Sequence, residues 1–205
     1  MKKAGKKNAY IPRVLMMVLT TVLIGVIVAI MLVVGQIQGT ARVVNYAGLV
    51  RGETQRIIKL ENASLPQDGM IDDVTSFIAG LRFGSKELQL VRLNDVNFQN
   101  KMAELSDEFE TLKKEIQLVR TVGYHQTDII QQSEDFFAIC DEATGLAAAY
   151  SQRRATILSY LENVAAADIV ALVALIALEL FHALQFAAQN RVLQTKVYKD
   201  EATGL

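Results

Sequence analysis

The sequence contains no tryptophan, two prolines and one cysteine. A single cysteine, Cys140, excludes an internal disulfide and any metal cluster held by several cysteines. Because proline breaks helices, its scarcity beside abundant Leu, Ala, Glu, Lys and Gln favours long helices. Neither positive nor negative charge is in excess, since the formal net charge is −1. Charged residues make up 21% of the chain and hydrophobic residues 51%. That balance indicates neither a disordered chain nor a nucleic-acid-binding protein.

A long run without charge lies near the N-terminus, at residues 14–34. Its length matches the roughly 20 apolar residues that a helix needs to cross a hydrocarbon core of about 30 Å. The run is too long for the core of a signal peptide and no Ala-x-Ala cleavage site follows it, so we expect an uncleaved transmembrane helix. Residues 1–13 carry five basic side chains, which predicts a cytoplasmic N-terminus by the positive-inside rule.

A second, less obvious apolar stretch lies at residues 168–188, where we predict another transmembrane helix. Arg191, Lys196 and Lys199 follow it, so residues 189–205 are expected to be a cytoplasmic helical linker. Residues 35–167 would then lie outside the membrane, and both termini would lie inside the cell. The sequence therefore predicts a multi-pass membrane protein with one extracytoplasmic domain.

Between the two predicted spans, apolar residues recur at helical spacing. The clearest pattern consists of Phe98, Met102, Leu105, Phe109, Leu112, Ile116 and Val119. A second consists of Phe136, Cys140, Ala143, Ala147, Tyr150, Arg154, Ile157, Leu161 and Val164, and a shorter one of Ile71, Val74, Ile78 and Leu81. With the helix that continues from the first span, these patterns predict an all-α fold, in which two transmembrane helices bracket a four-helix bundle. Residues 88–93 are the only plausible extended piece.

The helix after the first span carries two adjacent patterns. The first is mostly apolar and suits the core of the bundle: Val43, Ala47, Val50, Thr54 and Ile57. The second has apolar ends and a polar middle: Val44, Gly48, Arg51, Gln55 and Ile58. Gly48 and Gly52 are four residues apart, a spacing of small residues that lets two helices approach closely. We therefore expect a homodimer in which the second pattern meets its own copy across a two-fold axis.

In such a dimer the two Arg51 side chains converge. A buried charge without a partner costs several kcal/mol, whereas a planar oxyanion can accept bidentate hydrogen bonds from both guanidinium groups. We predict a site for a small inorganic anion at Arg51, with Gln55 on the same pattern and with no metal, cofactor or catalytic residue. The alternative, judged from spacing alone, is a solvated or salt-bridged surface arginine.

The residues Asn45-x-Ala47-Gly48-x-x-Arg51-x-x-x-x-Arg56 resemble the signature helix of bacterial nitrate/nitrite sensor kinases and of the related type IV pili chemoreceptor-like sensor domain. The resemblance implies a dimeric four-helix bundle outside the bacterial cytoplasmic membrane, in which Arg51 of both subunits binds nitrate or nitrite beside Gly48. It thereby adds Gly48 and Asn45 of the signature to the predicted site. One departure from the family pattern is Glu53, whose carboxylate would oppose anion binding unless Arg56 neutralises it. The sequence leaves the identity of the ligand open.

The C-terminal hexapeptide, residues 200–205, resembles the opening of the GGDEF diguanylate cyclase domain, and residues 141–146 repeat it within the predicted bundle. No nucleotide-binding loop or acidic metal cluster follows residue 188. We expect that the chain itself is not an enzyme, and that it is either a sensor fragment that signals to a missing output domain or a short protein that acts through partners. A diguanylate cyclase is favoured, with a histidine kinase or a chemoreceptor next.

Other polar residues have less specific interpretations. His125 is expected at a surface turn before the last helix, and Arg154 either joins the anion site or forms a salt bridge. Glu179 and His182 share one helical face of the second span, and ionisable groups in a membrane are functional hypotheses by default. A transporter subunit would need both for flux. The main competing interpretation is a ligand-free structural or accessory membrane protein whose bundle binds another protein.

Overall fold

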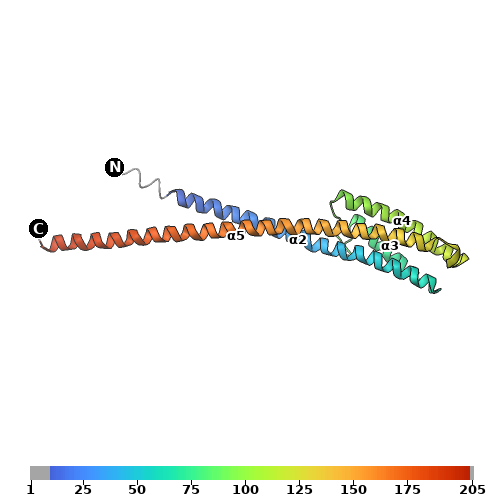
Figure 1. The fold of residues 1–205 in the computed structure, drawn as a ribbon. Helices are drawn as coiled ribbons and strands as arrows, with labels where there is room; N and C mark the ends of the chain where they lie inside the picture. Colours follow the sequence, from blue (N-terminus) through green and yellow to red (C-terminus); the bar gives the residue numbers. More distant parts are fainter. Residues whose placement is uncertain (1–9, 204–205) are drawn as a thin grey trace. The chain divides into compact units, whose positions relative to one another are not determined.

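The structure, a computed structural model, describes the backbone of residues 10–203 and the side chains of residues 10–194 (Figure 1). Its elements are α2 (Tyr10–Asn62), α3 (Asp68–Phe83), α4 (Val96–Val122), the short 3-10 helix η1 (Tyr124–Gln126) and α5 (Ile129–Thr203). Strands are absent from residues 10–203, so the predicted all-helical fold with four α-helices is confirmed. Residues 1–9 and 204–205, parts of the two predicted cytoplasmic ends, lie outside the described residues.

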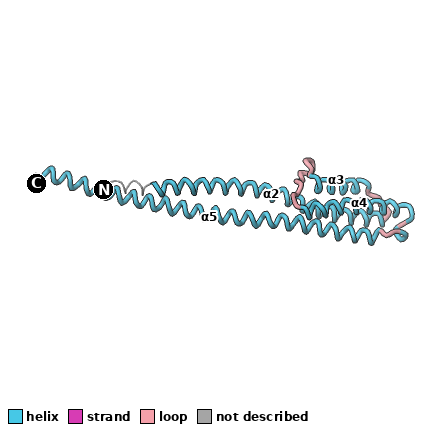
Figure 2. The backbone as a smooth tube through the Cα atoms, turned by 90° about the horizontal axis from the view of Figure 1, so that it is seen from above, coloured by secondary structure: helices cyan, strands magenta, loops and turns pink. Residues whose placement is uncertain are grey.

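Contacts divide the chain into two units. One combines Met1–Met31 with Ser159–Leu205, and the other is Leu32–Leu158. We call their described parts the apolar unit and the packed unit. The packed unit contains all of α3, α4 and η1, and Figure 2 shows the loops of the chain gathered in it. It ends at Leu158, earlier in α5 than the predicted boundary at residue 167.

The apolar unit consists of the first part of α2 and the last part of α5. Both helices are long and apolar enough to cross a membrane, judged by their length and composition. Large apolar side chains are exposed along both of them, for example Met17 and Phe181. Asp168 is a buried exception, and its Oδ2 atom has no hydrogen-bond partner among the described residues. Exposed apolar side chains along a whole helix are typical of helices whose surroundings are not water.

The core of the packed unit is formed by the patterns that the sequence shows. Every residue of the mostly apolar pattern on α2 and of the pattern on α4 is buried, as are Val74, Ile78 and Leu81 of α3. On α5 the pattern is buried from Phe136 to Ala147, but Ile157, near the end of the packed unit, is 44% exposed. Rings of Phe109 and Phe136 pack at 5.5 Å between α4 and α5. One hydrophobic core therefore joins all four helices.

The ends of α3 and α4 have local causes. Asp95 precedes α4 and its carboxylate accepts a hydrogen bond from the Phe98 amide at 3.0 Å, which satisfies a free N–H of the first turn. Gly84 and Gly123 follow α3 and α4 with φ of 85° and 87°, a backbone conformation that favours glycine. These residues fix where the chain leaves each helix.

The connection from α3 to α4 is a compact loop rather than an extended piece. Ser85 and Leu90 exchange two backbone hydrogen bonds, at 2.9 and 2.8 Å, and form an isolated bridge. Leu90 and Leu93 are buried in the common core. Leu90 packs on Gly80 so closely that a Cβ atom there would lie 2.9 Å from Leu90 Cδ1. Residues 88–93, the only plausible extended piece of the sequence, form no strand beyond the bridge at Leu90, because the loop folds back on α3.

Candidate ligand-binding site

Arg51, the central residue of the predicted site, forms an ion pair across two helices of the packed unit. Its Nη1 atom donates to Asp141 Oδ1 of α5 at 2.6 Å, and its guanidinium lies 5.3 Å from the centre of the Phe137 ring. Phe137 and Asp141 are four residues apart, one turn of α5, so they flank the arginine together. The Arg51 side chain is 36% exposed, and the Asp141 side chain 63%. The positive charge is therefore fixed in place yet accessible to solvent.

Cys140 lies beside this ion pair but points into the core. Burial raises the pKa of its thiol to about 12, with a further rise from Asp141 and a partial lowering by Arg51. The side chain is fully buried. A protonated, inaccessible thiol is neither a nucleophile nor a metal ligand at neutral pH, so Cys140 is a small core residue.

The other predicted site residues differ in burial and in their contacts. Gln55 is half-buried and its Nε2 atom donates a long hydrogen bond of 3.4 Å to the Ser133 carbonyl of α5. Gly48 is half-buried and Asn45 is exposed. The structure thus gives Arg51 and Gln55 side-chain contacts with α5, while Asn45 and Gly48 line an open groove beside them on α2.

Asn45 and Gly48 line a shallow groove on α2. Its volume is about 380 Å³, and its lining residues are Val44, Asn45, Gly48, Leu49, Gly52 and Glu53. A Cβ atom added at Gly48 or Gly52 would meet nothing within 4 Å, so the surface there is open. The apolar side chain of Leu49 is 36% exposed at the same place. Arg51 does not line the groove, because its side chain pairs with Asp141 of α5.

Charges near Arg51 are arranged partly as the sequence indicates. Glu53 and Arg56 lie 3.9 Å apart, which confirms the expected pair, although the contact is loose. The acidic partner of Arg51 is Asp141, which sequence reasoning missed together with Phe137. The signal available in the sequence was that Phe137 and Asp141 lie one helical turn apart, beside the apolar pattern of α5. Its pairing with Arg51 depends on how the two helices are rotated against each other.

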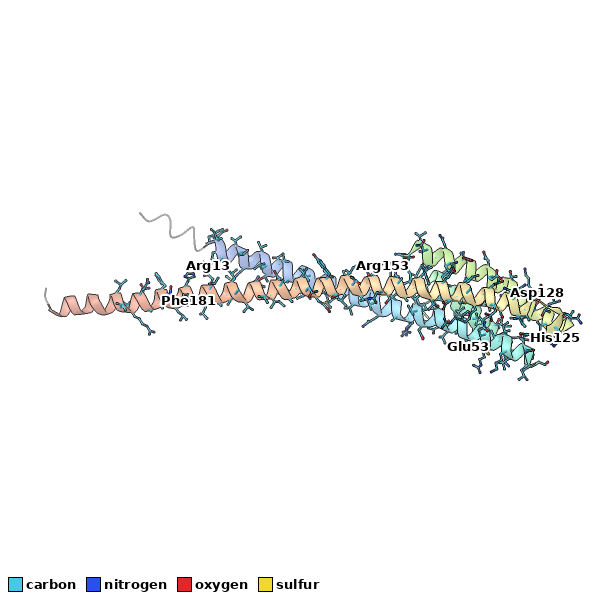
Figure 3. The ribbon with its side chains drawn as sticks, in the orientation of Figure 1. Arg13, Glu53, His125, Asp128, Arg153 and Phe181 are labelled. Atoms are coloured by element: carbon cyan, nitrogen blue, oxygen red, sulfur yellow. The ribbon has the colours of Figure 1, made fainter. Side chains whose placement is uncertain are left out.

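The remaining candidates are placed as follows. His125 is exposed within η1, at the turn between α4 and α5, which confirms the surface-turn interpretation (Figure 3). Within the described residues, no group of His, Cys, Asp and Glu could hold a metal ion. Arg154 forms no salt bridge there, and instead donates to the Tyr150 hydroxyl at 2.9 Å. Glu179 and His182 both lie in the described part of α5, and no hydrogen bond joins their side chains there.

No protein-family model matches the chain, and no curated protein matches it. Among solved structures, the chain is similar to the ligand-binding domain of the P. aeruginosa nitrate receptor McpN, at 14% sequence identity and a TM-score of 0.46. The match covers 54% of this chain and 96% of that domain. A similarity of this extent does not define a ligand site, so the site rests on the residues of this chain alone.

Proposed function

We propose that this chain is the membrane-anchored sensor module of a bacterial signalling protein. The packed unit would be an extracytoplasmic four-helix bundle that binds a small oxyanion, nitrate-like or nitrite-like, at Arg51. The observation that carries this proposal is the partly exposed guanidinium of Arg51, held between Asp141 and Phe137. A guanidinium oriented in advance loses little entropy when an anion binds, and its planar fork matches a planar oxyanion.

The occupant we propose for the groove beside Arg51 is a second copy of the chain. Open space over Gly48 and Gly52 lets another helix approach closely, and the exposed Leu49 offers apolar area to bury. A two-fold axis along this groove would place the Arg51 side chains of both copies at its edges. Each copy would then contribute one arginine to a shared anion.

Asp141 would act as the internal counter-ion of the empty site. Its carboxylate neutralises Arg51 when no ligand is present, and an incoming anion would compete with it. Because a ligand shifts a conformational equilibrium only through different affinities for the two states, release of Asp141 supplies such a difference between α2 and α5. The signal would therefore begin as a change in the contact between these two helices.

The route to the cytoplasm would be the two long helices. Both α2 and α5 continue without interruption from the packed unit into the apolar unit. Shifts of about 1–2 Å along packed helices are a known form of such signals. The output domain we propose is a diguanylate cyclase, with a histidine kinase or chemoreceptor next, and the chain itself would not be an enzyme.

Thermal unfolding of the full chain in detergent tests the anion site. Nitrate, nitrite and other small anions are added singly, and a ligand at 100 times its dissociation constant should stabilise the dimer by about 2.7 kcal/mol. We expect the effect to be lost in Arg51→Ala and kept in Arg42→Ala, because Arg42 bonds to Gln89 away from Asp141. A dimeric sample that no anion stabilises would instead support the structural or accessory protein.

A further inference from the structure

A second cavity lies at the end of the packed unit where the first apolar run ends. Its volume is about 380 Å³, and the residues that line it include Leu32, Gln36, Arg92, Asn94, Tyr150 and Arg154. They come from α2, from the loop between α3 and α4, and from α5, and all belong to the packed unit. The anion site proposed at Arg51 shares none of these residues.

Two of the lining side chains are cations without an anionic partner. Arg154 donates to the Tyr150 hydroxyl and lies 5.1 Å from the centre of its ring, which orients the guanidinium without neutralising it. Neither Arg154 nor Arg92 forms a salt bridge within the part of the chain that the structure describes. The neighbouring Arg153 differs, since Asp95 pairs with it at 2.6 Å. The cavity therefore carries uncompensated positive charge.

Further donors are available around the two arginines. The side-chain amides of Gln36 and Asn94 form no hydrogen bond with any described residue, and each offers an N–H₂ group. Two guanidinium groups and two amides can together satisfy several oxygens of one anion. A tetrahedral phosphate has oxygens in enough directions for donors that come from three separate elements.

The surface beside the cavity is suited to a lipid interface. Val91 lines the cavity and is 45% exposed, and Val96 nearby is 75% exposed. Exposed apolar side chains next to basic ones are typical of segments that contact headgroups and the acyl boundary. Leu32 and Gln36 fall at the predicted exit of the first span, which would put the cavity at headgroup depth.

We infer that this cavity binds a phosphate-type anion, either the phosphodiester of an anionic phospholipid headgroup or inorganic phosphate. Binding of a lipid headgroup rests on the proposed function, because it requires the packed unit to lie against the membrane. A bound headgroup would link the α3–α4 loop, α2 and α5 where they leave the bilayer. The cavity would then anchor the packed unit to the lipid surface.

Native mass spectrometry of the full chain in a phosphate-free maltoside detergent tests this inference. Phosphatidylglycerol, diacylglycerol and inorganic phosphate are added in separate titrations, and diacylglycerol serves as the lipid that lacks phosphate. We expect one tightly bound phosphatidylglycerol per chain and at least tenfold weaker binding of diacylglycerol. The variant Arg92→Gln/Arg154→Gln should lose at least tenfold in affinity for phosphatidylglycerol.

Matched variants separate a site from general charge or misfolding. Arg56→Gln/Arg82→Gln removes the same charge from the packed unit away from the cavity and should bind phosphatidylglycerol like the wild type. Arg92→Gln alone changes an exposed side chain that has no hydrogen bond or ion pair among the described residues, so it should keep the fold while weakening binding. Binding of inorganic phosphate without the lipid would identify free phosphate as the ligand. Equal binding of phosphatidylglycerol and diacylglycerol without phosphate binding, or equal loss in both double variants, would overturn the inference, whatever Arg51 binds.

Discussion

The Glu61 carboxylate of α2 accepts two hydrogen bonds from the Arg120 guanidinium of α4, at 3.0 Å from Nε and 2.5 Å from Nη2. The Glu61 side chain is only 2% exposed, while Arg120 also contacts Asp68 at the start of α3, at 2.7 Å. These contacts, with the Glu61 hydrogen bonds contributing most, raise the pKa of Arg120 further above its usual value. One guanidinium thus ties three helices together at the end of the packed unit.

Arg120→Ala should strongly destabilise the packed unit. The substitution leaves the Glu61 carboxylate buried without a partner, and loss of one partner of a buried pair costs about 3–5 kcal/mol. Because Arg120 is 30% exposed and water can reach the site, we expect about 2–3 kcal/mol. Urea unfolding of the full chain in detergent measures this change. Arg56→Ala is the matched control, since its loose exposed pair with Glu53 should contribute less than about 0.5 kcal/mol.

Phe136→Ala and Phe137→Ala should have different effects although the residues are adjacent. Phe136 is buried against Phe109, so its truncation should lower the free energy of unfolding by about 3–5 kcal/mol. Phe137 is 37% exposed and contacts Arg51, so its truncation should change stability by about 1 kcal/mol or less. Thermal unfolding distinguishes the two. Equal losses would mean that α5 is rotated differently from the structure.

Cys140 should resist alkylation in the native state. Its thiol is buried and its pKa is raised to about 12, so maleimide at pH 8 should label it only when the packed unit opens. Mass spectrometry of a labelling time course measures the rate. The control is Cys140→Ala/Ala148→Cys, because residue 148 is exposed on the same helix and should label at least a hundredfold faster.

The raised pKa of the Cys140 thiol predicts that the stability of the packed unit depends on pH. Its folded pKa is raised above the ordinary value of 9.0, so the stabilisation is fully present below pH 9 and is lost as pH rises toward 12. The free energy of unfolding should fall in that window by up to about 1.4 kcal/mol per pH unit relative to Cys140→Ala. Unfolding of both proteins in urea from pH 8 to 11 measures the difference. Parallel curves for the two would contradict the prediction.

Asp141→Asn tests the competition between an internal carboxylate and an external anion. The ion pair with Arg51 is exposed, so its loss should cost less than about 1 kcal/mol of stability. If the free energy of the lost ion pair is added to that of anion binding, the affinity for the anion should rise by about two- to fivefold. Isothermal titration with the anion that stabilises the wild type measures it. Glu142→Gln, which removes an adjacent exposed carboxylate paired with Lys101, should leave the affinity unchanged.

The core of the packed unit could be predicted because helical spacing determines which residues share a face. Val43, Val50 and Ile57 fall on one stripe of α2, and all three are buried. Helical spacing places Ile58 on the neighbouring stripe, yet it is also buried. It lies near the C-terminal end of α2, where the buried face is wider than one stripe. Spacing gives the direction of a side chain and leaves open how broad the covered face is.

The partners across helices could not be predicted in the same way. Arg51 pairs with Asp141, which is 90 residues away in the sequence, and this pairing requires both helix rotations and the relative register of α2 and α5. The conformation of the α3–α4 loop does not follow from the sequence for a related reason. Its bridge between Ser85 and Leu90 and its seat on Gly80 depend on a helix surface that propensity alone does not describe.

The seating of Leu90 on Gly80 also decides where the chain tolerates additions. A reporter peptide or fluorescent protein inserted within residues 85–93 would lift Leu90 and Leu93 out of the core and should expose the ends of α3 and α4. The turn at residues 63–66 is exposed and contributes no residue to the common core. That turn, rather than the longer α3–α4 connection, is therefore the place to graft a tag.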